Sequence, residues 1–283
     1  MSNRSEQVTA AVLRAWGLPD PGDSKKTRGE VMIFAGSRSA PGAALLAGEA
    51  ALRVGAGRVG LAVPPSIDVH IGVALPEAGV FALPEDASGP LPGRLREHVA
   101  SADAVLVGPG FDDPDQTRAT LLAVAGAQPS LLVVDAFATG VLPDVDRTAL
   151  PDRLIVNANK EEAGILLGRA LADDAPADLL EIARRFDAVI SCYGLTAHPD
   201  GRTWRSDEGG PGLGTSGSGD VRAGAITGFA GRGVDAAQAA VWGSWVHARA
   251  GSRLTERSGL GFLARELAGE LTPTLHEVLG SAS

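Results

Sequence analysis

Cysteine is almost absent from this chain of 283 residues, in which Cys192 is the only one. A single thiol excludes an intrachain disulfide and a cysteine metal cluster, so we expect a reducing, cytoplasmic location. Residues 1–16 predict an amphipathic helix, about 6–16, without the apolar centre or cleavage site of a signal peptide. No stretch approaches the roughly 18 consecutive apolar residues of a membrane span, so we predict no membrane partner.

Aromatic side chains and positive charge are also scarce, at 4% of the residues and a net charge of -9. Proteins that bind nucleic acids use a basic surface and, for single strands, aromatic stacking, so we predict no nucleic-acid partner. Nucleotide binding is still open, because backbone N–H groups at helix starts bind phosphates without a net positive charge. The 37 glycines favour an α/β protein with many glycine turns.

Short apolar runs alternate with segments of helical length along most of the chain. The runs are residues 31–35, 58–63, 104–107, 131–134, 154–156 and 188–192. Nearly all-apolar strands separated by helices predict a mainly parallel sheet covered by helices on both faces. Residues 195–198 and 203–205 flank a Pro-Asp-Gly turn and predict a hairpin. No linker or repeat divides the chain, so we expect one domain over residues 1–283.

Glycine and polar residues follow several of these strands, at Gly36, Gly108–Gly110, Asp135 and Asn157–Glu162. Ligands of open α/β sheets bind beyond the carboxyl ends of the strands, so we expect these residues at one cleft. An asparagine and a glutamate three residues apart can hold hydrated Mg²⁺ near phosphates. They can equally cap the helix that they open. Asp135 is likewise open to a site role or a structural one.

The most informative segment is GGPGLGTSGSGDVRAGAITGF, residues 209–229. Its glycines run straight into a helix, so the N–H groups near Gly217, Ser218 and Gly219 predict an anion site. A carboxylate at this position would repel phosphate, so its presence there favours a catalytic role. Asp220 could act as the general base for a hydroxyl that receives a phosphoryl group. The alternative is an ordinary acidic residue in a first helical turn. No Walker lysine pattern occurs, and the five histidines show no spacing typical of metal ligands.

Four segments resemble the bacterial ADP-dependent NAD(P)H-hydrate dehydratases of the ribokinase-like superfamily. They are residues 28–59, 105–111, 133–138 and 209–224, and residues 246–270 are similar to the actinobacterial branch. The resemblance implies a ribokinase-like three-layer sandwich that restores NADH or NADPH from the hydrated forms NADHX and NADPHX. ADP (ATP in eukaryotic relatives) and Mg²⁺ would serve the reaction. Phosphorylation of the stray hydroxyl makes it a leaving group, and the ring nitrogen then expels phosphate.

The resemblance also assigns roles to individual residues. Substrate contacts fall to Ala43, Gly110, Asn159 and Asp220, with Asp220 as the catalytic base. Nucleotide contacts fall to Tyr193, Gly194, Leu195, Thr196, Gly217, Ser218 and Gly219, and Glu162 would hold Mg²⁺ through water. Two positions depart from the family pattern, because Asn159 stands at a histidine position and Tyr193 at a lysine position. Tyrosine in place of lysine at position 193 removes a positive charge that would face phosphate.

Three further expectations follow from the same resemblance. The chain would form a homotetramer, and it would work with a separate NAD(P)HX epimerase because no room remains for an epimerase domain. A kinase that phosphorylates a stable alcohol is an alternative that Asn159 and Glu162 favour. A nucleotide-binding protein without catalysis is a second alternative, which Tyr193 favours.

Overall fold

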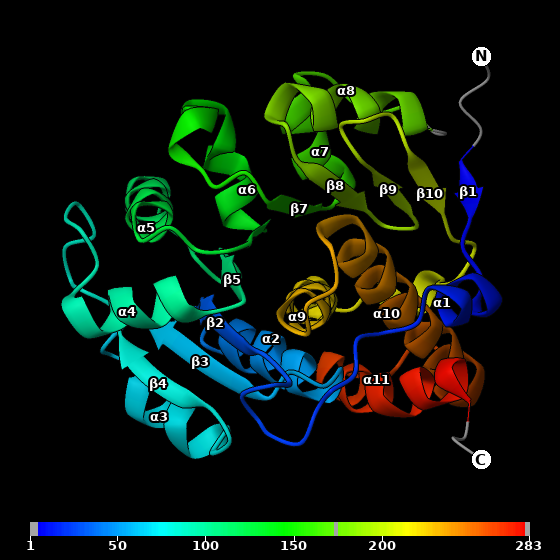
Figure 1. The fold of residues 1–283 in the computed structure, drawn as a ribbon, viewed down its shortest axis with the longest axis horizontal. Helices are drawn as coiled ribbons and strands as arrows, with labels where there is room; N and C mark the ends of the chain where they lie inside the picture. The colour runs from blue at the N-terminus through cyan, green and yellow to red at the C-terminus, as the bar shows by residue number, and fades with distance from the viewer. Residues whose placement is uncertain (1–4, 173–174, 281–283) are drawn as a thin grey trace.

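The computed structural model describes residues 5–172 and 175–280, and its centre is a single ten-stranded sheet (Figure 1). The strands are β1 (Glu6–Gln7), β2 (Glu30–Phe34), β3 (Arg58–Val63), β4 (Gly79–Ala82), β5 (Ala104–Val107), β6 (Leu132–Asp135), β7 (Leu154–Ala158), β8 (Val189–Cys192), β9 (Leu195–Ala197) and β10 (Thr203–Arg205). Their order is β1-β10-β9-β8-β7-β6-β5-β2-β3-β4. All pairs from β8 to β4 are parallel, whereas β9 is antiparallel to both of its neighbours. The predicted mainly parallel sheet and the predicted hairpin are therefore confirmed.

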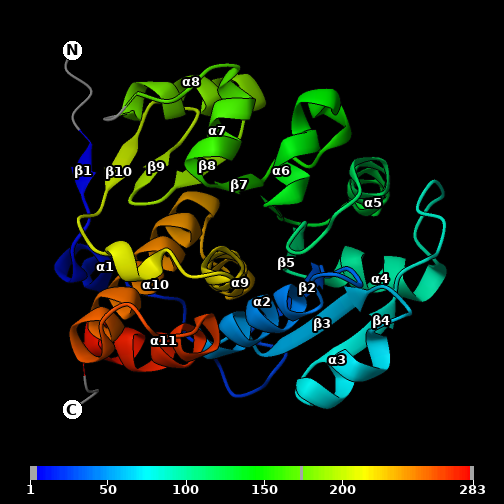
Figure 2. The same cartoon turned by 180° about the vertical axis from the view of Figure 1, so that it is seen from behind.

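Helices cover both faces of this sheet (Figures 1 and 2). They are α1 (Ala10–Trp16), α2 (Gly42–Arg53), α3 (Asp68–Ala74), α4 (Gly93–Ser101), α5 (Pro114–Gly126), α6 (Phe137–Val141), α7 (Lys160–Leu167), α8 (Pro176–Phe186), α9 (Ser218–Gly231), α10 (Ala236–Ser258) and α11 (Ala264–Leu279). Short 3-10 turns lie at Leu142–Asp144, Arg147–Ala149 and Pro211–Leu213. Helices α4 to α8 pack on one face, and α2, α9, α10 and α11 pack on the other. The result is the predicted three-layer sandwich.

The strands are apolar throughout because each face of the sheet is buried under its own layer of helices. In β5, Val105 and Val107 point into the layer of α4 to α8, while Leu106 points into the opposite layer. A strand buried on both faces cannot alternate apolar and polar side chains. The continuous apolar runs in the sequence follow from this arrangement.

Helices α2 and α9 lie side by side and run in the same direction. A Cβ on Gly224 would lie 2.7 Å from Ala47 Cα, and a Cβ on Gly228 would lie 2.9 Å from Ala51 Cα. Both members of the pair advance by four residues, which is about one helical turn. The amino ends of α2 and α9 therefore meet at one end of the molecule. Because α2 follows β2, this is the end where the parallel strands have their carboxyl ends.

The helix expected over residues 6–16 is shorter, because residues 6–7 form the edge strand β1 and pair with β10. The helix begins at Ala10, where the side chain of Thr9 accepts a hydrogen bond of 3.3 Å from the N–H of Val12. The sequence reading also missed β4 and the helices α3 and α4. In the described ranges, no helix is both long enough and apolar enough to cross a membrane.

Candidate functional site

The glycine-rich loop ends at the start of α9, as predicted. Gly217 precedes the helix with a φ of 87°, and a Cβ there would lie 2.5 Å from Leu46 Cδ1, so only glycine fits this position without strain. Across the described chain, no side chain caps this helix start. The N–H of Ser218 donates to the carbonyl of Thr215 at 3.2 Å, so the N–H groups of Gly219 and Asp220 are the ones left for an anion, and the helix dipole favours negative charge there.

A cavity of about 360 Å³ lies between this helix start and the turn that joins β8 to β9. The predicted nucleotide residues Tyr193, Gly194, Ser218 and Gly219 line it, and so does Asn159. We call it the nucleotide cavity. Its other lining residues include Glu208, Gly214, Thr215, Arg222, Ser244 and His247.

Leu195 and Thr196 lie outside the lining of the nucleotide cavity. Leu195 lines a neighbouring cavity of about 200 Å³ together with Lys160. Thr196 is only 4% exposed, and its Cα pairs with that of Ser191 inside the sheet. The hydroxyl of Ser191 lies 2.8 Å from that of Ser244 on α10, and cross-strand partners point to the same face. Thr196 therefore faces the layer of α10, the same layer that supplies Ser244 and His247 to the nucleotide cavity, although Thr196 does not itself line the cavity.

Asp220 lies in the first turn of α9. Partial burial and the charge of Glu162 raise the pKa of its carboxyl to about 6. A carboxyl that titrates near neutral pH is ionised in the cell yet basic enough to accept a proton from a reacting hydroxyl. The electrostatic setting of Asp220 therefore suits a general base better than a mere helix cap.

The predicted substrate residues Gly110 and Ala43 are in contact. A Cβ on Gly110 would lie 2.6 Å from the Cβ of Ala43 and 3.2 Å from the Cα of Gly36. Ala43 and Asp220 each lie one turn before the contact of Ala47 with Gly224, so the parallel packing of α2 and α9 brings them to the same place. A cavity of about 140 Å³ adjoins this cluster, and Gly36 and Phe111 line it.

Asn159 and Glu162 form a capping box at the start of α7. The Asn159 side chain accepts from the N–H of Glu162, and Glu162 Oε2 accepts from the N–H of Asn159, both at 2.9 Å. The structural role that the sequence left open is thus realised. The cap uses Oε2 of Glu162 and leaves Oε1 outside the capping box. Burial raises the pKa of Glu162, opposed by this hydrogen bond and by the charge of Arg222.

Asp135 ends β6 as a buried carboxyl. Asn157 on β7 donates a hydrogen bond of 2.6 Å from Nδ2 to its Oδ1. Burial, with smaller contributions from the charges of Glu162 and Asp220, raises the pKa of Asp135 well above its ordinary value. Burial thus favours the protonated form of Asp135.

Two side chains of the nucleotide cavity, Arg222 and His247, were not among the predicted site residues. The Nε2 of His247 lies 3.0 Å from Ser218 Oγ and 2.9 Å from Ser218 O, and burial lowers the pKa of this imidazole to about 3. His247 is therefore neutral. It could not be placed from sequence because it lies on α10, 29 residues beyond Ser218. Arg222 could have been noted, since it lies four residues after Ser218 on the same helical face.

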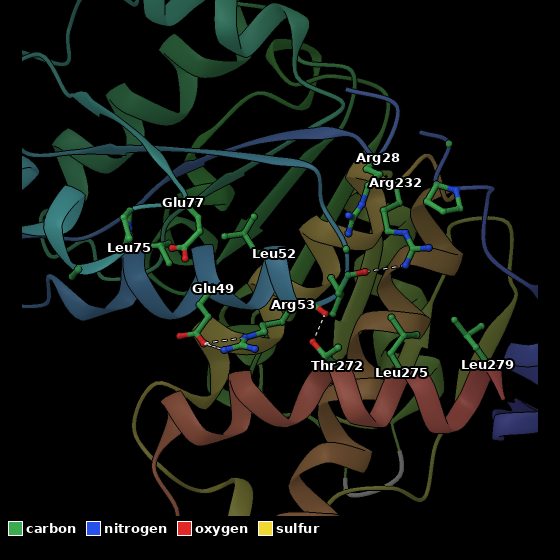
Figure 3. Close-up of a pocket in the computed structure, with 16 residues that line it drawn as sticks. Arg28, Glu49, Leu52, Arg53, Leu75, Glu77, Arg232, Thr272, Leu275 and Leu279 are labelled. Atoms are coloured by element: carbon green, nitrogen blue, oxygen red, sulfur yellow. Dashed lines mark hydrogen bonds and ion pairs between the residues drawn. The ribbon is translucent and has the colours of Figure 1, made fainter. Parts of the chain in front are cut away.

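A larger cavity of about 890 Å³ lies at the opposite end of the molecule, among α2, α11 and the loop before β2 (Figure 3). Its side chains are engaged with each other: Arg53 pairs with Glu49 at 3.0 Å, and Arg232 donates to the carbonyl of Val54 at 2.9 Å. None of the predicted site residues lines it. Size alone does not make it the active site, because it lies at the amino ends of β2 and β3, away from Asp220.

Comparison with known proteins gives one consistent result. The NAD(P)H-hydrate dehydratase family matches residues 31–273. The ADP-dependent (S)-NAD(P)H-hydrate dehydratase of Xanthomonas campestris is 42% identical over 281 residues, which cover 95% of each chain. The bifunctional NAD(P)H-hydrate repair enzyme of Moorella thermoacetica is 34% identical over 96% of this chain, which spans 53% of that enzyme. The structure of the Bacillus subtilis ADP/ATP-dependent NAD(P)H-hydrate dehydratase, co-crystallized with ATP/Mg²⁺, is 25% identical and superposes with a TM-score of 0.84, covering 97% and 99% of the two chains.

Proposed function

Because this chain belongs to the NAD(P)H-hydrate dehydratase family, we propose that it is an ADP-dependent lyase that restores NADH and NADPH from their hydrates. The observation that carries the proposal is the position of Asp220. This carboxyl has a pKa of about 6 and lies in the first turn of α9, where the backbone can bind phosphate. Base and phosphate site are thereby held on one rigid helix.

In the proposed mechanism, ADP binds in the nucleotide cavity with its terminal phosphate at the start of α9. The N–H groups of Gly219 and Asp220 hold the phosphate oxygens. The stray hydroxyl of the hydrate lies beside Ala43 and Gly110, within reach of Asp220. Asp220 accepts the hydroxyl proton while the oxygen attacks the terminal phosphorus, and the bond from that phosphorus to the rest of ADP breaks, releasing AMP.

The second half of the reaction needs little from the protein. The ring nitrogen donates its electron pair and expels the phosphate, so the carbon–oxygen bond breaks. The neighbouring ring carbon then loses a proton to solvent, and the reduced nicotinamide ring is restored. The products are the intact cofactor, AMP and inorganic phosphate. The enzyme acts as a kinase whose product decomposes.

The donor set at the site is compatible with Mg²⁺. This ion keeps several waters and binds through one or two carboxylates together with phosphates. Glu162, through its free Oε1 and a water molecule, would hold it. Among the described residues, no three acidic, histidine or cysteine side chains form a metal cluster. When bound, the ion neutralises part of the phosphate charge.

The remaining roles rest on the family. Tyr193 and Gly194 would contact the nucleotide from the turn after β8, and Asn159 would contact the substrate from the edge of the nucleotide cavity. By the same resemblance we infer a cytoplasmic homotetramer. We also infer a functional link to an NAD(P)HX epimerase, since relatives such as the Moorella enzyme are bifunctional.

A kinase for a stable alcohol shares the first step of this mechanism. Asn159 and Glu162 favoured it in the sequence, but the capping box accounts for both residues without a kinase site. Phosphorus NMR of a reaction with NADHX, ADP and Mg²⁺ separates the two activities. The dehydratase yields AMP and inorganic phosphate from NADHX, whereas a kinase for a stable alcohol would leave NADHX unrepaired and would accumulate a phosphate ester only when such an alcohol is supplied. ADP binding without either product would leave a nucleotide-binding protein.

A further inference from the structure

Arg222 occupies an unusual position for a charged side chain. It lies in the second turn of α9 and is only 7% exposed, yet it lines the nucleotide cavity. Side chains of a helix point back toward its amino end, so the guanidinium extends from Arg222 toward the phosphate-binding start of α9. A buried charge needs partners that compensate for its lost hydration.

The contacts of Arg222 leave part of its guanidinium free. Nη2 donates a hydrogen bond of 2.8 Å to the carbonyl of Ala158 at the end of β7. The guanidinium carbon lies 5.5 Å from the centre of the Tyr193 ring. Among the described residues, Nε finds no acceptor although it is buried. Buried donors without a partner are costly and uncommon, so the contacts within the protein do not fully compensate the buried guanidinium.

The charges around the cavity indicate which ligand the guanidinium would favour. Arg222 is the one lysine or arginine among the described residues that line the nucleotide cavity, and Glu208 is the one carboxylate. His247 is neutral because its pKa is lowered to about 3. Lys160 is exposed and lines the neighbouring cavity instead. The phosphates of a nucleoside diphosphate in this cavity would therefore lie near a single positively charged side chain, that of Arg222.

We propose that the guanidinium of Arg222, which lines the nucleotide cavity, binds a phosphate of the nucleotide, and that the Tyr193 ring holds the guanidinium in place. Arg222 thereby supplies the positive charge that a lysine at position 193 would otherwise bring. The planar guanidinium suits phosphate oxygens, which accept charge-assisted hydrogen bonds from it. This inference rests on the proposed function for the identity of the ligand.

Calorimetric titration with ADP and with adenosine tests the proposal. Arg222→Met keeps the apolar stem and removes the charge, so we expect ADP affinity to fall about ten- to a hundredfold, with adenosine affinity unchanged. Arg222→Lys should keep part of the ADP affinity. Arg232→Met is the matched control, since Arg232 ends the same helix, donates to a carbonyl and lies over the Phe229 ring. It should leave the affinity for both ligands unchanged.

Tyr193→Lys completes the test. Added to Arg222→Met, it should restore ADP affinity, whereas in the wild-type background it should bring no gain because the phosphate already has its cation. A purely structural role for Arg222 would weaken ADP and adenosine equally and would not be rescued by this lysine. If Arg222→Met fails to fold by circular dichroism, selective loss of ADP affinity in Arg222→Lys decides the question.

The titrations also separate this inference from the proposed function. Unchanged ADP affinity in Arg222→Met would overturn the inference even if the wild type repaired NADHX. Tight, Arg222-dependent ADP binding without any repair would support the inference and contradict the function. Failure of the wild type to bind ADP would overturn the phosphate contact directly.

Discussion

Replacement of Asp220 by asparagine should abolish turnover and yet stabilise the free protein. The two side chains have nearly the same shape, so the start of α9 should keep its geometry. Asparagine cannot accept the hydroxyl proton, and loss of a general base typically costs about a hundred- to ten-thousandfold in rate. The gain in stability follows from the pKa of the carboxyl.

Burial and the charge of Glu162 raise the pKa of Asp220 from the ordinary 3.8 to about 6. One pKa unit is worth about 1.36 kcal/mol, so ionised Asp220 costs the native state up to about 3 kcal/mol. The cost arises because the native state holds the proton more tightly than the unfolded chain. It is absent below pH 4, grows as the pH rises to about 6, and is complete above it. Asparagine carries no such cost at any pH.

Urea unfolding of wild type and Asp220→Asn at a series of pH values measures this difference. We expect equal stability near pH 4 and a gain for the variant of up to about 3 kcal/mol at pH 8. Turnover of the wild type should fall as the pH drops through about 6, because the base becomes protonated. A variant whose advantage does not depend on pH would refute the assigned pKa. Near-normal turnover in the folded variant would refute the role of Asp220.

Three further outcomes are expected elsewhere in the chain. Gly110→Ala should cut turnover and cost about 1–3 kcal/mol in a denaturant titration, because φ is +71° and the new Cβ would lie 2.6 Å from that of Ala43. Its control is Gly261→Ala, which meets nothing within 4 Å and should change neither quantity. Asn159→Ala should cost about 1 kcal/mol of unfolding free energy through loss of the helix cap, and no loss would contradict the capping box. Cys192 is buried and its thiol pKa is raised by that burial, so Ellman's reagent should label it only after unfolding.

The parts of the fold that sequence could predict are those with a local physical cause. The apolar strands β2, β3 and β5 to β8 were recognisable because both faces of each are buried. β4 was missed because Gly79–Ala82 is a short, partly exposed edge strand without a clear apolar run. The predicted N-terminal helix was too long at its start. Residues 6–7 pair with β10, about 200 residues away in the chain, and no local sequence pattern reveals such a pairing.

The candidate site divides in the same way. The loop from Gly217 to Asp220 was predictable, because glycine density and a helix start lie together in the sequence. The burial of Thr196 was not, since the face to which a strand residue points depends on its register with the neighbouring strands. His247 reaches Ser218 only through the packing of α10 on α9. Glu162 caps α7 through Oε2, and the proposed Mg²⁺ contact would use the other carboxylate oxygen.

The most direct test of the central claim is a spectrophotometric assay with chemically prepared NADHX, ADP and Mg²⁺. The wild-type protein should restore the NADH absorbance in the presence of ADP, and Asp220→Asn should not. Omission of the nucleotide should abolish the recovery. Wild-type protein that consumes ADP without restoring the absorbance, or that does neither, would contradict the assignment of this chain as an NAD(P)H-hydrate dehydratase.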